Sequence, residues 1–172
     1  GTTNNSFFAN VNTGTGTDPA GTVAPGQPGC SNGTFAAPWQ TLIRARKCVV
    51  AGDTVYGLNG LQQITTDGNN AALNLALAAA GTAGNEIALL AYPGATVQIG
   101  VSCPTAAGDP TLPAPCDTAR PVYGITSFRP YWIFGGLTIQ GRAIAINGNA
   151  NRNRYIGDNF SCPYGNGAAA CV

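Results

Sequence analysis

The 172-residue chain contains no histidine and no methionine, and only 9% of its residues are charged. Nucleophilic catalysis of the usual Ser-His or Cys-His kind is therefore excluded, since the six cysteines are expected to form disulfides. A net charge of +1 provides no field that would gather a polyanion such as DNA. We therefore expect no nucleic-acid partner.

Long apolar runs are also missing. The most apolar stretch begins at Leu73, is interrupted by Asn74 and ends before Gly81, so it is shorter than the roughly 18 residues that span a bilayer. We expect no membrane insertion. The first residue is Gly1 rather than methionine, which fits a mature secreted product whose targeting segment has been removed.

The cysteines form an even set that lacks the Cys-x2-Cys spacing of zinc sites. Proximity favours three local disulfides, although other connectivities stay open: Cys30 with Cys48, Cys103 with Cys116, and Cys162 with Cys171. Disulfides indicate an oxidising compartment, so we expect a secreted protein that is extracellular or at the cell surface. Three Asn-x-Ser/Thr motifs are candidate glycosylation sites, at Asn4, Asn32 and Asn159.

What the chain does have is glycine, proline and short apolar runs, a composition unlike that of disordered proteins. Residues 82–100 contain a buried strand from Ile87, a Tyr92-Pro93-Gly94 corner and a second, alternating strand around Val97. Comparable strands begin at Thr54, Trp132 and Arg154. The successive intervals, roughly 33, 45 and 22 residues, are those expected of a solenoid turn.

One domain is expected at this length, with three parts. Residues 1–37 would form an N-terminal strand near Phe7 and a loop, and residues 51–172 would form the coils, with a disulfide loop inserted at 101–120. Pro38 and the apolar spacing that follows it predict a helix over 38–50, whose apolar stripe would cap the first coil. The basic residues Arg44, Arg46 and Lys47 would form its exposed face.

The order of several motifs resembles the N-terminal part of the right-handed parallel β-helix proteins of the pectate lyase-like superfamily, up to about residue 160. The motifs are Phe7-Phe8-x-x-Val11, Ala37-Pro38-Trp39-x-Thr41-Leu42, Ala51-Gly52-Asp53-Thr54-Val55-Tyr56, Ala91-Tyr92-Pro93-Gly94 and Tyr131-Trp132-Ile133. The resemblance implies an all-β fold, a short right-handed parallel β-helix of about four coils with one N-terminal capping α-helix. It implies no single activity, because the superfamily includes lyases, hydrolases, epimerases, adhesins and structural repeats.

Lyases of this superfamily use a base and calcium held by several carboxylates. None of the seven acidic residues lies two positions from another in one strand, so we assign no catalytic residue, no cofactor and no metal ligand. Asp53 is expected to bind nearby backbone, and Asp67 to lie in a turn, with calcium binding as the alternative. Asp117 and Asp158 are the pair that coil stacking would have to bring together in a hydrolase.

Arginine is the residue best suited to grip an anionic sugar. Arg142, Arg152 and Arg154 are the candidates, with surface solvation as the alternative, and Arg152 and Arg154 would share a face of an extended strand.

We expect a non-catalytic extracellular structural protein, a β-helix subunit that self-assembles head-to-tail into a filament or surface layer. An uncovered last coil is a template for another chain, and the strand around Phe7-Phe8 is a candidate donor. Its partners would be copies of itself and, secondarily, carbohydrate. The alternative function is the N-terminal portion of a secreted polysaccharide lyase or glycoside hydrolase whose catalytic coils are absent from this chain.

Overall fold

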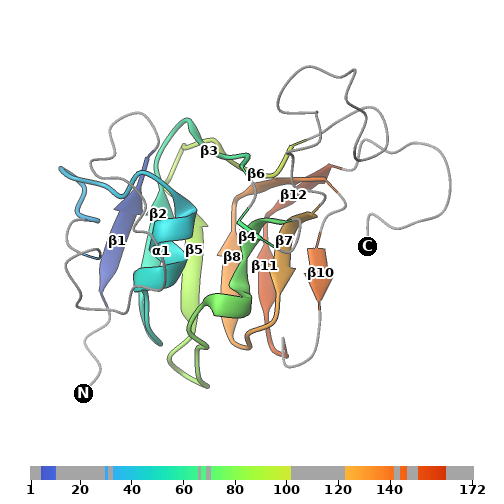
Figure 1. Ribbon diagram of the computed structural model, residues 1–172. Helices are drawn as coiled ribbons and strands as arrows, with labels where there is room; N and C mark the ends of the chain where they lie inside the picture. Colours follow the sequence, from blue (N-terminus) through green and yellow to red (C-terminus); the bar gives the residue numbers. More distant parts are fainter. Residues whose placement is uncertain are drawn as a thin grey trace, which may run out of the picture.

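The structure is a computed structural model and describes residues 5–10, 30, 33–65, 67–68, 71–101, 123–141, 144–146 and 151–161 (Figure 1). Its elements in chain order are β1 (Ser6–Ala9), α1 (Leu42–Cys48), β2 (Thr54–Gly57), β3 (Leu61–Gln63), β4 (Ala71–Asn74), the 3-10 helix η2 (Leu75–Leu77), β5 (Ile87–Ala91), β6 (Val97–Ile99), β7 (Tyr123–Ser127), β8 (Trp132–Gly135), β9 (Thr138–Gln140), β10 (Ile144–Ile146), β11 (Arg154–Ile156) and β12 (Asn159–Ser161).

The strands form three parallel sheets. Sheet 1 has the order β1-β2-β5-β8-β11, sheet 2 the order β3-β6-β9-β12, and sheet 3 the order β4-β7-β10. From β2 onward the chain therefore visits sheets 1, 2 and 3 in the same sequence, and each strand pairs with the third strand after it. We call one such set of successive strands a rung.

The sequence correctly predicts the strands of sheet 1. Thr54, Ile87, Trp132 and Arg154 are the first residues of β2, β5, β8 and β11, and all four strands lie in this one sheet. An all-β architecture of parallel sheets with one short α-helix is confirmed. The inserted loop predicted at 101–120 lies outside the described residues, apart from Val101.

The core lies on the inward faces of the sheets. In sheet 1 the inward row contains Val55, Leu89 and Phe134, which are in register across neighbouring strands and are buried. The ring of Phe134 stacks on that of Tyr155 in the next strand, with 4.9 Å between centroids. Period-two alternation within each strand therefore becomes a continuous apolar row across strands.

The helix is shorter than the predicted 38–50. It begins after Thr41, whose hydroxyl oxygen accepts a hydrogen bond from the Arg44 N–H at 3.1 Å, as expected of an N-cap. Trp39 does not join the helix, because it forms a parallel β-bridge with Ala9. Its ring is fully buried and stacks on that of Phe7, with 4.7 Å between centroids.

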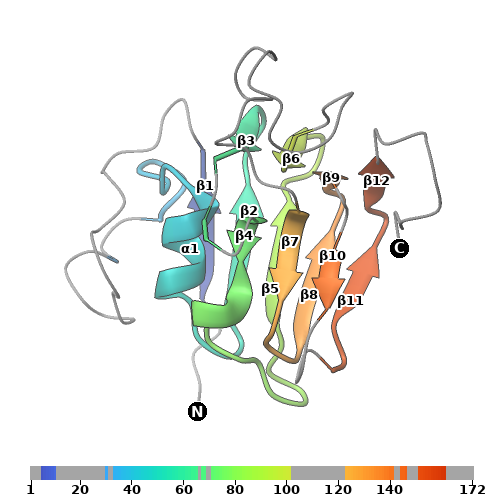
Figure 2. The same cartoon turned by 45° about the vertical axis from the view of Figure 1, so that its right-hand side comes forward.

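The predicted exposed face of the helix is wrong. Arg44 and Arg46 are only 5% and 3% exposed, and Lys47 is half-buried. The helix contacts β1, β4 and η2, so it is enclosed on more sides than the amphipathic pattern indicates. Figure 2 shows α1 beside β1 and β4, at the end of the stack opposite β10, β11 and β12.

Candidate functional site

At one end of the strand stack, the outer edge of sheet 1 is closed by backbone hydrogen bonds. The outer edge of β1 donates from Phe8 to the Gly33 carbonyl oxygen at 2.7 Å and from Asn10 to the Trp39 carbonyl oxygen at 2.7 Å. In return the Trp39 N–H donates to the Phe8 carbonyl oxygen at 2.8 Å. These groups are therefore not available to an added strand.

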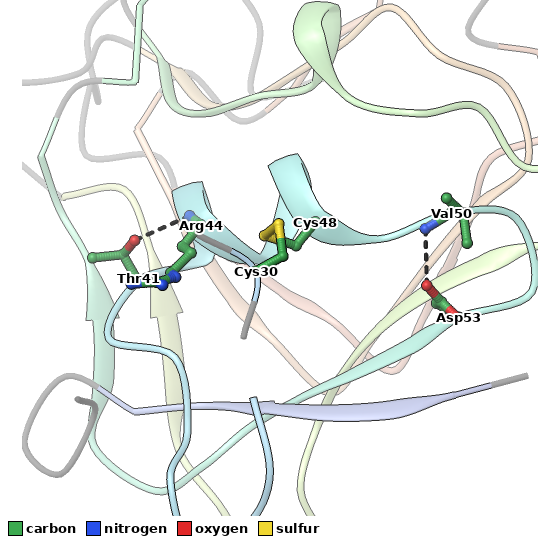
Figure 3. The surroundings of a disulfide bond; sticks show 6 residues. All are labelled: Cys30, Thr41, Arg44, Cys48, Val50 and Asp53. Atoms are coloured by element: carbon green, nitrogen blue, oxygen red, sulfur yellow. Dashed lines mark hydrogen bonds between the residues drawn. A yellow bond between two sulfur atoms is a disulfide. The ribbon is translucent and has the colours of Figure 1, made fainter. Parts of the chain in front are cut away.

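A disulfide and a side-chain bond fix α1 over this closed end. Cys30 and Cys48 are joined with an S–S distance of 2.02 Å, and Figure 3 shows the bond at the C-terminal end of the helix. At its N-terminal end, the Leu42 N–H donates to Oε1 of Gln63 in β3 at 3.2 Å. The predicted Cys30–Cys48 disulfide is thus present, and the other four cysteines lie outside the described residues.

A buried ion pair links the helix to the chain before β4. Arg46 donates from Nε and from a terminal nitrogen to the two carboxylate oxygens of Asp67. The Asn74 N–H donates to Oδ2 of the same carboxylate at 3.0 Å. Asp67, for which the sequence left calcium binding open as an alternative, therefore binds Arg46 and the backbone. Its neighbours Asn69 and Asn70 lie outside the described residues.

Asp53 has the backbone-binding role predicted for it. Its Oδ2 accepts from the Val50 N–H at 2.9 Å, which closes the turn between α1 and β2 (Figure 3). Its Oδ1 accepts from the Asn5 N–H at 3.3 Å and so holds the start of β1. The carboxylate is 2% exposed, a position suited to structure rather than to contact with a substrate.

The other end of the stack carries the strand edges of β10, β11 and β12. Among the described residues, no strand pairs with the outward edges of these three. The inward-facing ring of Phe160 is 41% exposed, although Ile139, its register partner one strand below, is fully buried. Phe160 lies edge-on to Tyr155, with 5.9 Å between centroids. The described part of this end therefore offers both backbone groups and apolar surface.

Polar atoms near this end are incompletely paired. Oδ1 of Asp158 accepts from the Leu137 N–H at 2.7 Å, whereas Oδ2 of Asp158 and Oγ of Ser161 are buried without a hydrogen-bond partner among the described residues. Burial raises the pKa of the Asp158 carboxyl, with the bonds from Leu137 and Ile156 opposing this shift. Burial, and secondarily the charge of Asp158, also raises the pKa of the Tyr155 hydroxyl. Asp117, which a hydrolase would need close to Asp158, lies outside the described residues.

The candidate anionic-sugar contacts engage different neighbours. The Arg152 guanidinium carbon lies 5.7 Å from the ring centroid of Tyr131, and Arg154 approaches Glu86 to 3.6 Å. Arg152 has a φ of 64°, so it belongs to a turn and not to the extended strand that would align it with Arg154. Arg142 lies outside the described residues.

The glycosylation candidates are placed only in part. Asn159 is exposed, and because it precedes the inward-facing Phe160 it lies on the outward face of sheet 2, in register with Thr138. Asn4 and Asn32 lie outside the described residues. The prediction that these sites carry glycans remains a prediction.

Among residues that the structure describes, no three or more His, Cys, Asp or Glu side chains are grouped so that they could hold a metal ion. No helix in the described ranges is long and apolar enough to cross a membrane.

Comparisons with protein families, with curated proteins and with solved structures found no match. The geometry of the two ends is therefore the basis for a functional assignment.

Proposed function

We propose that the three sheets are the faces of a right-handed parallel β-helix, and that this protein is a non-catalytic extracellular structural subunit. Copies associate through the strand edges of β10, β11 and β12. The pairing of each strand from β2 onward with the third strand after it supports the solenoid, because stacked rungs require that pairing.

The contrast between the two ends carries the proposal. At the β1 end, the edge strand is bonded to Gly33 and Trp39, and α1 is held by a disulfide. At the opposite end, the described part of the structure has unpaired strand edges and an aromatic residue, Phe160, that is 41% exposed. A second β-helical rung would satisfy the edges and cover this ring.

The closed end favours pairs over filaments. Head-to-tail growth requires two free ends, and the strand predicted as a donor is β1, which pairs with β2 over its full length from Ser6 to Ala9. Donation of this strand would break that pairing. Two copies that meet through their β10–β12 ends would instead form a symmetric, closed dimer with both helices facing outward.

The structural role and the extracellular location have independent support. The carboxylates of Asp53 and Asp67 accept hydrogen bonds from backbone N–H groups and hold the local chain conformation, so these buried carboxylates are not free to act as bases. The Cys30–Cys48 disulfide suits an oxidising compartment.

The alternative, an N-terminal portion of a secreted polysaccharide lyase or glycoside hydrolase, predicts a longer parent chain that cleaves an anionic polysaccharide with calcium.

The test is the mass of the protein in solution, measured by light scattering after size exclusion. We expect the wild type to have about twice the mass of its 17.4 kDa chain. Phe160→Lys, at the β10–β12 end, should give the single-chain mass, whereas Val50→Lys, at a 41% exposed site beside the cap, should leave the dimer intact. A wild type that is a single chain at all concentrations, or a native parent chain hundreds of residues longer, would overturn the proposal.

A further inference from the structure

An uncharged apolar row crosses the outward face of sheet 1. Phe8, Tyr56, Leu90, Gly135 and Ile156 are successive register partners in β1, β2, β5, β8 and β11. Adjacent strands lie about 4.8 Å apart, so the row is roughly 19 Å long. This surface is a strip, a shape that suits a chain molecule better than a small compact ligand.

Two further aromatic rings widen the strip at its β1 end. Phe35 lies edge-on to Phe8 with 5.3 Å between centroids, and Tyr92 lies edge-on to Tyr56 at 6.0 Å. Phe35 and Tyr92 are themselves 5.9 Å apart and are 59% and 40% exposed. Exposed aromatic side chains that contact one another are typical of interaction sites.

The chemistry of the strip is neutral. The segments 5–10, 33–43, 54–61 and 88–101, which supply its aromatic end, contain no charged residue. The polar groups that they do supply include the hydroxyls of Tyr56 and Tyr92. Large apolar faces combined with hydroxyls match a sugar ring, which has apolar C–H faces and a hydroxyl rim, better than they match an ionic ligand.

A peptide fits this strip less well than a glycan. Extended peptides are bound by backbone groups at a sheet edge, whereas the strip lies on a sheet face, where the backbone groups of β2, β5 and β8 bond to neighbouring strands. The described segments at the aromatic end supply no cation that could pair with an anionic glycan. Arg154 is the charged neighbour at the far end of the sheet, and it approaches Glu86.

We propose that the outward row of sheet 1, together with Phe35 and Tyr92, binds an uncharged linear polysaccharide that runs across the strands, parallel to the axis of the stack. This site is separate from the association end, so it goes beyond the structural role proposed above. The sugar rings would pack on the aromatic side chains, and the row from Leu90 to Ile156 would extend the contact.

The experiment is affinity electrophoresis and calorimetry of the wild type with mixed-linkage β-glucan and hydroxyethyl cellulose, with polygalacturonate as the anionic comparison. We expect binding to at least one neutral polymer and none to polygalacturonate. Tyr92→Ala and Phe35→Ala should each weaken binding about tenfold, the loss of one aromatic contact. Val50→Ala, an exposed apolar change away from the strip, is the matched control, and circular dichroism melts check folding.

Several results would overturn the inference. These are failure to bind either neutral polymer, tighter binding to polygalacturonate, or equal affinity in the wild type and the two aromatic variants. Loss of the dimer in Tyr92→Ala with no change in glycan binding would instead make the strip an interface between copies. Phe160→Lys should keep glycan binding while it abolishes the dimer, so failure of one proposal is distinguishable from failure of the other.

Discussion

Arg46 and Asp67, 21 residues apart in sequence, form a buried, two-point ion pair that ties α1 to the chain before β4. Their side chains are 3% and 5% exposed. A planar guanidinium can satisfy both carboxylate oxygens at once, which makes arginine the suitable partner for a buried carboxylate. The ion pair therefore joins the cap to the chain before β4, while the disulfide joins it to Cys30.

Asp67→Asn should destabilise the protein strongly, because it leaves the Arg46 charge buried without a counter-ion. We expect a loss of about 3–5 kcal/mol in the free energy of unfolding, measured by urea denaturation. Glu86→Gln is the control, since its partner Arg154 is 61% exposed, and it should cost less than about 1 kcal/mol. Equal effects of the two changes would contradict the buried pair.

Replacement of both Cys30 and Cys48 by alanine should lower stability by about 3 kcal/mol, the value expected for a loop of this size. The two residues are 18 apart in sequence. Guanidinium denaturation measures the loss, and non-reducing peptide mapping checks the pairing in the wild type. Mapping that joins Cys30 to any other cysteine would rule out the bond on which this expectation depends.

Gly100→Ala should be far more destabilising than Gly94→Ala. Both glycines have a positive φ, 83° at Gly100 and 77° at Gly94, so an alanine would have similar backbone strain at each position. A Cβ at Gly100 would lie 2.1 Å from the Gln140 carbonyl oxygen, whereas a Cβ at Gly94 would meet no atom within 4 Å.

We therefore expect a cost of about 1 kcal/mol for Gly94→Ala and more than about 3 kcal/mol for Gly100→Ala in thermal unfolding. The comparison tests how closely the turn after β6 approaches β9 in the next rung. Similar melting temperatures for the two variants would show that the rungs are not this close.

Asp158→Asn should stabilise the protein at neutral pH. Burial raises the pKa of the Asp158 carboxyl, so the folded state binds the proton more tightly than the unfolded chain does. Stability is then lost as the pH rises from about 4, the ordinary carboxyl pKa, through the raised folded value. Asparagine avoids this loss and keeps an oxygen acceptor for the Leu137 N–H.

Urea midpoints at pH 3 and pH 7 measure this effect. The variant should match the wild type at pH 3 and exceed it at pH 7. Glu86→Gln makes the same charge change outside this pocket and serves as the control. A wild type that gains stability over Asp158→Asn as the pH rises would show that the carboxylate is favoured, not disfavoured, at its site.

The local features of the fold could be predicted from sequence because each is encoded within a few residues. The strand starts at Ile87 and Trp132 follow from short apolar runs bounded by glycine and proline, and the Asp53 turn follows from the Gly-Asp-Thr corner. The predicted helix start is wrong because helical spacing at Trp39 does not reveal that its backbone pairs with β1.

The contacts between distant segments could not be predicted. The helical spacing predicts that Arg46 is exposed, because its partner Asp67 comes close to it only in the folded chain. A single sequence contains no signal for this contact between Arg46 and Asp67. The apolar row of sheet 1 depends in the same way on register, which places Phe8, Tyr56 and Leu90 side by side from three separate strands. A shift of one residue in any strand would turn its side chains to the other face.

Single-particle electron microscopy of the wild-type protein shows directly whether two copies associate through their β10–β12 ends. We expect particles of two strand stacks joined through these ends, with a helical cap at each outer end. Single stacks at micromolar concentration would contradict association through this end. Filaments in which the cap of one copy meets the β10–β12 end of the next would contradict the closed cap.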